Sequence, residues 1–209
     1  MSFIRTIVAA LALLAIPATA AKFCDGQVCY SEFVSPQQIA FRVAIPNTPA
    51  QGTSFDLLLQ IVAPKTVGWA GIGWAGQMVN NPLTIAYSDG GSGVTVSSRW
   101  ASSMSLPSPY PGALYEKLPM SATNATHWRL DVICTGCSSW QGGGLDPAST
   151  TAAIAWAMAY ATPGQPSSNT SSIRYHSSRG HIDFDLAAAK IANFNEAISA
   201  LRGGGARTV

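Results

Sequence analysis

Charged side chains are scarce in this sequence. Lys, Arg, Asp and Glu together make up 11% of its 209 residues, the formal net charge is +2, and the basic residues form no cluster. Nucleic acids and anionic membranes bind concentrated positive charge, so neither is an expected partner. The ten acidic residues are scattered, without the paired carboxylates or the Ser/His/Asp frame of a hydrolase. No Gly-x-Gly-x-x-Gly motif lies in a βαβ pattern, so no dinucleotide-binding unit is indicated.

Long apolar runs are absent except near the start of the chain. Residues 1–20 combine a basic Arg5, a short apolar stretch over 7–16 and the small residues Ala18-Thr19-Ala20. This pattern is typical of a cleaved secretory signal peptide, because the apolar stretch is too short to span a bilayer and ends at Pro17. The alternative is an uncleaved anchor. We therefore expect a secreted, extracellular protein whose mature part is soluble and forms one domain.

Cysteine is also infrequent, with four residues in all. In a secreted chain four cysteines indicate two disulfides, for which three connectivities are possible. We favour the local pairs Cys24–Cys29 and Cys134–Cys137, because each loop contains a glycine that can adopt a tight turn. The Cys-Thr-Gly-Cys segment lacks the βαβ setting of a thioredoxin-type motif. Covalent attachment of a c-type haem there is excluded, since Ser138 stands where that motif requires His.

The sequence is rich in Ser, Thr, Gly and Ala. Two sequons, Asn124-Ala125-Thr126 and Asn169-Thr170-Ser171, predict N-linked glycans at Asn124 and Asn169. Glycans and Ser/Thr side chains would then supply the solubility that few charges provide.

Segments of strand length recur between Gly, Pro, Asn and Ser turn signals. The predicted strands cover residues 38–45, 54–62, 68–74, 83–87, 93–100, 126–134 and 152–159. Such spacing is typical of a β-sandwich or barrel. The end of the chain differs, because residues 185–201 have helical composition and stop at Gly203-Gly204-Gly205. We predict an all-β, antiparallel sandwich over residues 21–195 with a short C-terminal helix, followed by a tail over 196–209.

Two possible iron ligands lie far apart in the sequence. Met78 ends the run Gly-Trp-Ala-Gly-Ile-Gly-Trp-Ala-Gly-Gln-Met, and His176 begins His-Ser-Ser-Arg-Gly. A thioether and an imidazole together can hold a low-spin haem iron and raise its reduction potential. Spacing by itself does not establish this, because any β-protein can carry one buried Met and one His in a turn.

Several stretches, taken together, resemble the haem-binding cytochrome domain of fungal cellobiose dehydrogenases and the iron-reductase-type cytochromes of the DOMON-like group. The resemblance runs from about residue 23 to about 192, and its order and spacing are more specific than any one motif. Its carriers are residues 24–30, Gly-Ile-Gly leading to Gln-Met, Arg-Trp-Ala at 99–101, Thr-His-Trp at 126–128, Cys-Thr-Gly-Cys-Ser-Ser-Trp at 134–140, and His-x-x-x-Gly at 176–180 leading to Phe-Asp-Leu. The resemblance implies an immunoglobulin-like, antiparallel β-sandwich that holds haem b non-covalently, with Met78 and His176 as the iron ligands.

Other methionines and histidines in the sequence are alternative candidates for the iron ligands. Outside this context Met78 would be read as a core residue, since thioethers fill irregular gaps. Met104 is read as packing near the pocket. His181 is a weaker candidate than His176, because in the family the ligand precedes the glycine by four residues. His127 is read as a surface or strand-edge histidine.

Three further residues are candidates for the walls of a haem pocket. Trp74 could lie against the porphyrin or be a core tryptophan. Arg99 could pair with a haem propionate, because its planar guanidinium matches a carboxylate, or it could be an exposed sheet arginine. Tyr110 could donate a hydrogen bond to a propionate.

The resemblance implies an electron-transfer protein rather than an enzyme with its own dehydrogenase site. The donor would be an extracellular flavin dehydrogenase or another reductant, and the acceptor a copper polysaccharide monooxygenase or ferric iron, with the chain acting as a monomer. The alternative is a non-redox DOMON-like module that binds sugar or another ligand. A stacking platform for such a ligand could be built from Trp69, Trp74, Trp100 and Trp140.

Overall fold

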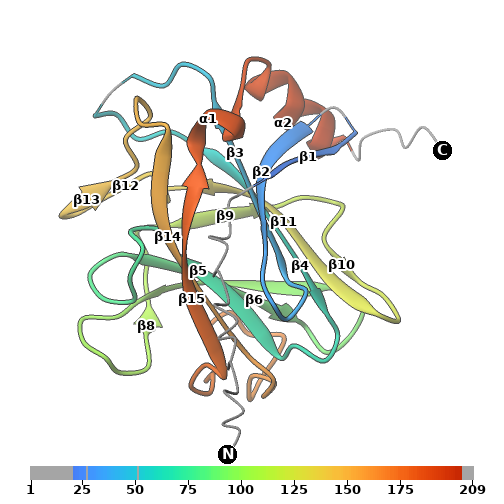
Figure 1. Ribbon diagram of the computed structural model, residues 1–209. Coiled ribbons are helices and arrows are strands. Elements are labelled where there is room, and N and C mark those ends of the chain that lie inside the picture. The colour runs from blue at the N-terminus through green and yellow to red at the C-terminus, as the bar shows by residue number, and fades with distance from the viewer. Residues whose placement is uncertain (1–20, 27, 51, 204–209) are drawn as a thin grey trace, which may run out of the picture.

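Two antiparallel β-sheets pack face to face in the computed structural model, which describes residues 21–203 except 27 and 51 (Figure 1). The predicted all-β sandwich is therefore confirmed. The signal peptide predicted over residues 1–20 lies outside the described residues. Seven strands were predicted, and each is present with ends that differ by no more than a few residues, because Gly and Pro turns bound them.

The first sheet has the order β1-β2-β3-β4-β11-β10. The short strand β9 pairs with β11, and β16 pairs in parallel with β3. The strands are β1 (Ala21–Asp25), β2 (Val28–Val34), β3 (Ala40–Pro46), β4 (Leu57–Pro64), β9 (Leu114–Lys117), β10 (Ala122–Thr123), β11 (His127–Thr135) and β16 (Lys190–Ile191).

The second sheet has the order β15-β14-β5-β6-β7-β8. Its strands are β5 (Trp69–Gly73), β6 (Pro82–Ser88), β7 (Val94–Trp100), β8 (Ser108–Pro109), β14 (Thr151–Ala159) and β15 (Ser178–Asp185). A separate two-stranded hairpin, β12 (Ser139–Trp140) with β13 (Gly143–Gly144), projects from the sandwich (Figure 1).

The predicted C-terminal helix exists but is interrupted. Helix α1 (Leu186–Ala189) is capped by the Asp185 carboxylate, which accepts a hydrogen bond from the backbone of Ala188. The chain then extends as β16 before α2 (Phe194–Arg202) begins. The reading of residues 185–201 as one helix is wrong, because pairing of β16 with the end of β3 outweighs helix propensity there. Helix α2 spans the predicted domain boundary at residue 195 and buries Phe194 and Ile198.

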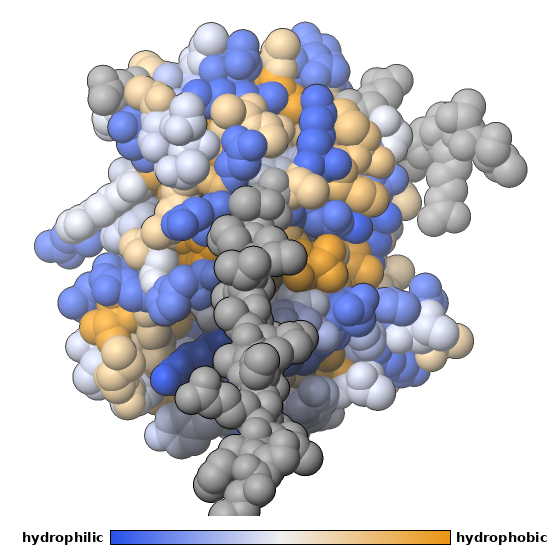
Figure 2. Space-filling view, viewed as in Figure 1, coloured by the Kyte–Doolittle hydropathy of each residue, from blue (hydrophilic) through white to orange (hydrophobic). Residues whose placement is uncertain are grey.

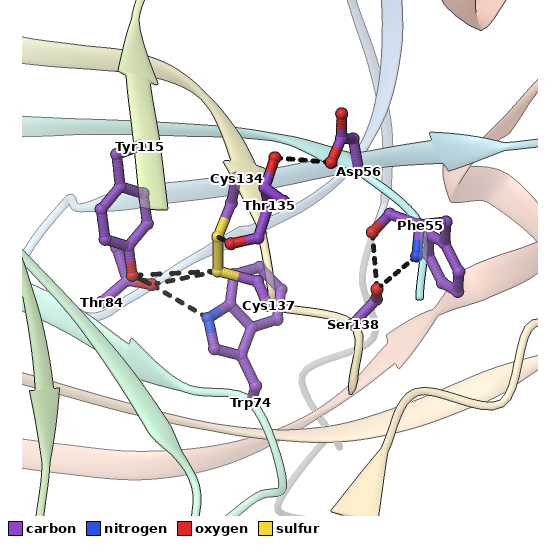
Figure 3. Close-up of a disulfide and its surroundings, with 9 residues drawn as sticks. All are labelled: Phe55, Asp56, Trp74, Thr84, Tyr115, Cys134, Thr135, Cys137 and Ser138. Atoms are coloured by element: carbon purple, nitrogen blue, oxygen red, sulfur yellow. Dashed lines mark hydrogen bonds between the residues drawn. A yellow bond between two sulfur atoms is a disulfide. The ribbon is translucent and has the colours of Figure 1, made fainter. Parts of the chain in front are cut away.

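Both predicted disulfides are present. Cys24–Cys29 closes the β1–β2 hairpin, and Cys134–Cys137 closes a turn at the end of β11. The glycine in each ring has positive φ, at +60° in Gly26 and +84° in the second ring, as the turn argument required. Figure 3 shows the second disulfide in the interior beside the indole of Trp74.

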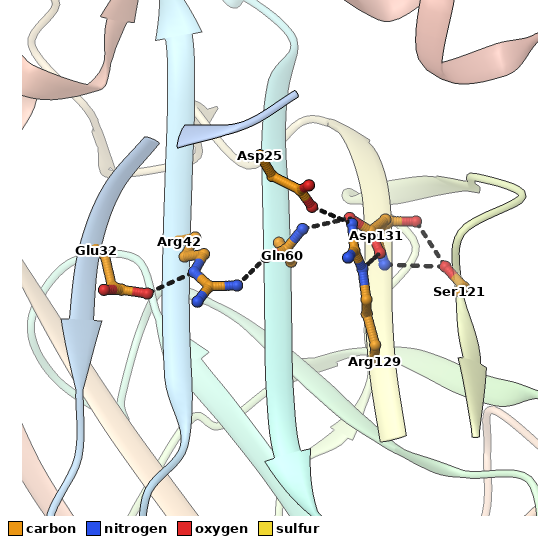
Figure 4. A network of polar contacts seen from close by, with 7 residues as sticks. All are labelled: Asp25, Glu32, Arg42, Gln60, Ser121, Arg129 and Asp131. Atoms are coloured by element: carbon orange, nitrogen blue, oxygen red, sulfur yellow. Dashed lines mark hydrogen bonds and ion pairs between the residues drawn. The ribbon is translucent and has the colours of Figure 1, made fainter. Parts of the chain in front are cut away.

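A row of polar side chains crosses four strands of the first sheet (Figure 4). Glu32, Arg42, Gln60 and Asp131 occupy successive cross-strand positions, and each is hydrogen-bonded to the next. Arg129 closes the row through Asp131 and Asp25. The buried members are paired, as burial of charge requires. The face of the molecule shown in Figure 2 is mostly hydrophilic or mixed, with hydrophobic residues gathered at mid-height.

Candidate functional site

The outer face of the second sheet carries unusually small side chains at its centre. On β5, Gly73 is paired with Ala155 of β14 on one side and with Leu83 of β6 on the other. Two residues earlier on β5, Gly71 is paired with Ala157 and Ile85 of the same two strands. Because side chains alternate along a strand, these residues point away from the sandwich core, whereas Ile72 and Ile154 point into it. The two glycines and two alanines form a low floor, which we call the platform.

The platform is the base of a cavity of about 520 Å³. Two walls rise beside it. One is the 101–107 loop before β8, and the other is the 160–177 segment that joins β14 to β15. The lining is mainly apolar and includes Leu83, Ile85, Leu106 and Ile173. Its size and character are those of a site for a small organic molecule or cofactor.

Met78 reaches this cavity from the loop that follows β5. Buried Asn81 holds the loop, because its side-chain amide donates to the carbonyl oxygen of Gln77 at 2.6 Å and to that of Val79 at 3.3 Å. Its Oδ1 also accepts from the backbone of Ala75 at 3.3 Å. The same loop pairs with the start of the opposite wall, since Asn80 N donates to the Ala101 carbonyl. Met78 is therefore presented by a fixed loop.

His176 reaches the cavity from the 160–177 segment, just before β15. The segment is bound to the sheet here, because Ser177 N donates to the carbonyl of Met158 at 2.7 Å. The indole of Trp69 donates to the Arg174 carbonyl at 3.2 Å. His176 is half-buried, and its Nε2 lies 3.5 Å from a guanidinium nitrogen of Arg179.

Register places the two candidate ligands at opposite ends of the platform. Strand β15 begins at Ser178, which is paired with Met158 of β14. Met158 is in turn paired with Ala70, at the start of β5. His176 precedes that point, whereas Met78 follows the other end of β5. The rival His181 also lines the cavity, but it is aligned with Ala155 and hence with the Met78 end. Met78 and His176 thus approach the platform from two directions.

The other three predicted pocket residues lie elsewhere. Trp74 is fully buried in the core between the sheets, where its Nε1 donates to Thr84 Oγ1 at 2.9 Å. Tyr110 is half-buried and packs on Trp100 with ring centroids 4.9 Å apart. Neither lines the cavity. For Trp74 the surroundings favour the interpretation as a core residue, and contact of either side chain with a haem stays a prediction.

Arg99 is neither exposed nor in the cavity lining. It is 4% exposed, so its interpretation as an exposed sheet arginine is wrong. The side chain points outward from β7, level with Leu83, and its donors are taken by Ser97 and by backbone carbonyls behind both cavity walls. Pairing with a propionate stays a prediction that this geometry does not favour.

The structure brings to the cavity several residues that the sequence analysis did not assign to it. Arg174 and Arg179 supply positive charge at the mouth. Three large apolar side chains of the rim are solvent-exposed: Met104 at 79%, Tyr175 at 67% and Leu106 at 44%. The two arginines flank His176 in sequence, a signal that the search for a propionate partner overlooked.

The tryptophans proposed as a stacking platform do not share one surface. Trp74 and Trp69 are buried, while Trp140 belongs to the β12–β13 hairpin. Asn124 and Asn169 are both exposed, as an acceptor for a glycan must be, and glycosylation stays a prediction. None of the helices within residues 21–203 is long and apolar enough to cross a membrane.

Comparison with known proteins identifies the class to which this fold and cavity belong. The family described as the cytochrome domain of cellobiose dehydrogenase matches residues 23–196, so the chain belongs to that family. A curated relative, the pyrroloquinoline quinone-dependent pyranose dehydrogenase of Coprinopsis cinerea, is 36% identical over 129 residues, which cover 61% of this chain. The match covers 18% of that relative, so the chain corresponds to a minor part of its length.

Solved structures agree. The cytochrome b domain of pyranose dehydrogenase from Coprinopsis cinerea superposes with a TM-score of 0.79 at 28% identity, covering 88% of this chain and 96% of that one. The cytochrome domain of Myriococcum thermophilum cellobiose dehydrogenase has the same fold, with a TM-score of 0.78 at 23% identity over 89% of this chain and 98% of that one. The predicted family is thus confirmed.

Proposed function

We propose that this protein is a secreted b-type cytochrome that relays single electrons, with haem b held non-covalently above the platform by Met78 and His176. The observation that carries the proposal is that these two side chains line one cavity from opposite ends of the platform. Met78 and His176 would both have to reach the iron of a bound haem, and they enter the cavity from different directions. His181, at the Met78 end, fits this arrangement less well.

The residues of the cavity suit the chemistry of a haem. An apolar macrocycle needs an apolar lining, and its burial would cover the exposed side chains of Met104, Leu106 and Tyr175. The two carboxylates of a haem need cations, which Arg174 and Arg179 place at the mouth. Covering the rim would remove apolar surface from water, which stabilises binding.

Bound haem would supply a one-electron Fe(III)/Fe(II) couple, and a thioether ligand raises its reduction potential. Met78 and His176 would hold the iron, and coordination by both would disfavour binding of a small molecule to the metal. The apolar rim would exclude water. These roles suit electron transfer rather than turnover of a substrate.

Partners follow by analogy with the family. The matched relatives are sugar dehydrogenases, so we propose a separate extracellular dehydrogenase, or a small reductant, as the electron donor. A copper polysaccharide monooxygenase or ferric iron is proposed as the acceptor. Cleavage of residues 1–20, glycans at Asn124 and Asn169, and a monomeric state complete the proposal.

The test is a visible absorption spectrum of the secreted protein, oxidised and then reduced with dithionite. We expect a sharp, low-spin b-type spectrum in the wild type. Met78→Ala and His176→Ala should each turn it high-spin or abolish it. Met104→Ala and His181→Ala are matched controls, because they line the same cavity, and they should keep the low-spin spectrum. A wild type that stays colourless with haem supplied would refute the proposal.

A further inference from the structure

Arg99 is a buried cation without an anionic partner. Within the described part of the chain it takes part in no ion pair, and it is 4% exposed. Its Nε donates to Ser97 Oγ at 2.6 Å, and its terminal nitrogens donate to the carbonyl oxygens of Pro107 at 3.4 Å, Asn169 at 3.2 Å and Ser171 at 2.6 Å. Carbonyl dipoles offset its charge in place of a carboxylate. Such an arrangement is costly, so it calls for an explanation.

The acceptors belong to both walls of the cavity. Pro107 ends the 101–107 loop and itself lines the cavity. Asn169 and Ser171 belong to the 160–177 segment, which carries His176 five residues further on. Ser97 reinforces the second contact, because its hydroxyl donates to the Asn169 carbonyl while accepting from Arg99. One guanidinium therefore joins the two walls to β7.

Other side chains also hold the 160–177 segment, but from one side. Tyr87 donates to the Ser168 carbonyl at 2.7 Å, and Thr95 donates to the Pro166 carbonyl at 2.6 Å. Trp69 holds the carbonyl next to the candidate ligand, at Arg174. Among these sheet residues, Arg99 alone also bonds to the 101–107 loop. Its planar fork of donors suits several acceptors at fixed angles, which a lysine would not match.

Arg99 is also close to the platform. It is level with Leu83, which is level with Gly73, so two strand spacings of about 5 Å each separate β7 from β5. Inside a protein a positive charge at roughly 10 Å is weakly screened. A fixed positive charge opposes the more positive, oxidised state of a nearby redox centre.

We propose that Arg99 is a positioning residue that sets the distance between the cavity walls, and so the placement of His176, and that its charge raises the reduction potential of the bound group. This inference rests on the proposed function, although the wall-bridging role concerns the protein itself.

The test compares Arg99→Lys and Arg99→Met with the wild type. Hydrogen exchange of the haem-free proteins should be faster at amides of residues 164–176 in both variants. In the haem-loaded proteins, transfer of haem to a scavenging protein should be faster by about tenfold or more, as loss of a residue that orients a metal ligand typically causes. The reduction potential should fall in Arg99→Met and stay near the wild-type value in Arg99→Lys, because lysine keeps the charge.

Arg42→Met is the matched control. Arg42 is also a largely buried arginine, but it pairs with Glu32 on the opposite sheet. It should lower stability while leaving exchange at residues 164–176, haem transfer and potential unchanged.

The bridging role would be overturned if amides of residues 164–176 exchanged in Arg99→Lys at the wild-type rate. It would also be overturned if Arg42→Met accelerated their exchange as much as the Arg99 variants do. If Arg99→Met does not fold, Arg99→Lys decides this point. An unchanged potential in a folded Arg99→Met would overturn the charge effect. Failure of the wild type to bind haem would refute the proposed function, yet the exchange experiment would still decide the bridging role.

Discussion

Trp74 offers a sharp test of which residues belong to the core and which to the cavity. The indole is fully buried and donates to Thr84 Oγ1, which in turn bonds to the Tyr115 hydroxyl at 2.7 Å (Figure 3). Trp74→Phe removes this hydrogen bond, at about 1 kcal/mol, and part of the buried ring. Since complete truncation of a buried Trp costs about 3–5 kcal/mol, the smaller change should cost roughly 1–2 kcal/mol more. We expect a total loss of about 2–3 kcal/mol.

The measurement is urea unfolding of the haem-free protein, so that the cofactor plays no part in it. Thr84→Val leaves the Trp74 indole without its acceptor and removes a hydrogen-bond partner of the Tyr115 hydroxyl. The free energy of unfolding should fall by about 1–3 kcal/mol. In the double variant the indole N–H is absent, so it no longer adds the cost of an unpaired buried donor. The two losses should therefore combine to about 1 kcal/mol less than their sum.

Two results would refute this reasoning. One is strict additivity, which would mean that the Trp74–Thr84 contact carries no energy. The other is a Trp74→Phe protein of unchanged stability but altered haem spectrum, which would place the indole at the cofactor.

Three further outcomes are expected. Ala155→Phe should abolish haem uptake without unfolding the protein, because it fills the platform, while Thr151→Phe at the exposed start of β14 should not; absorption titration with haem measures both. Burial raises the pKa of Tyr115 above its usual 10.0, so the folded state favours the neutral phenol. Stability should hold below about pH 10 and fall above it, and the fall should be shallower in Tyr115→Phe, as followed by circular dichroism. Asp131→Leu should cost about 3 kcal/mol in urea unfolding and leave haem uptake intact, because it breaks the paired row on the opposite sheet.

Strands could be predicted where both a residue pattern and a terminator were present. The segment 126–134 alternates and begins after Asn-Ala, and β11 follows it closely as His127–Thr135. Strands β8, β10 and β16 have two residues each, too few to carry a period, and their pairing depends on partners distant in sequence. The break between α1 and α2 was missed for the same reason, since it arises from pairing with β3.

The candidate ligands Met78 and His176 were proposed from the family resemblance, which matches each of them through a short glycine-containing motif. The surroundings of Arg99 could not be predicted. Two of its acceptors are backbone carbonyls 70 and 72 residues away, and a carbonyl is present in every residue, so no residue type marks these contacts. The sequence therefore marked the arginine as a candidate but could not indicate the carbonyl oxygens that it contacts in the protein, and its pairing with a propionate stays a prediction.

Trp74 is a different case, because strand alternation already separated it from the platform. Gly71 and Gly73 share one face of β5, so Ile72 and the next even position must share the other. If the glycine face holds a flat ligand, Trp74 has to point into the sandwich. The sequence analysis placed both glycines inside the predicted strand 68–74 but did not identify them as the floor of a site, because a residue without a side chain contributes nothing to a hydrophobic pattern.

The outer face of the second sheet explains why such a floor can exist without weakening the fold. One half is covered by the 160–177 segment, whose Ile173 packs with Trp69, Ile85 and Tyr87. Beside it lies the cavity, whose floor includes Gly73 and Ala155. Because small side chains expose little apolar surface, the empty cavity floor lowers the stability of the fold only slightly. Packing that stabilises the fold and a cavity that could hold a ligand are thereby adjacent on one sheet face, and Arg99 on β7 bonds to carbonyl oxygens of both cavity walls.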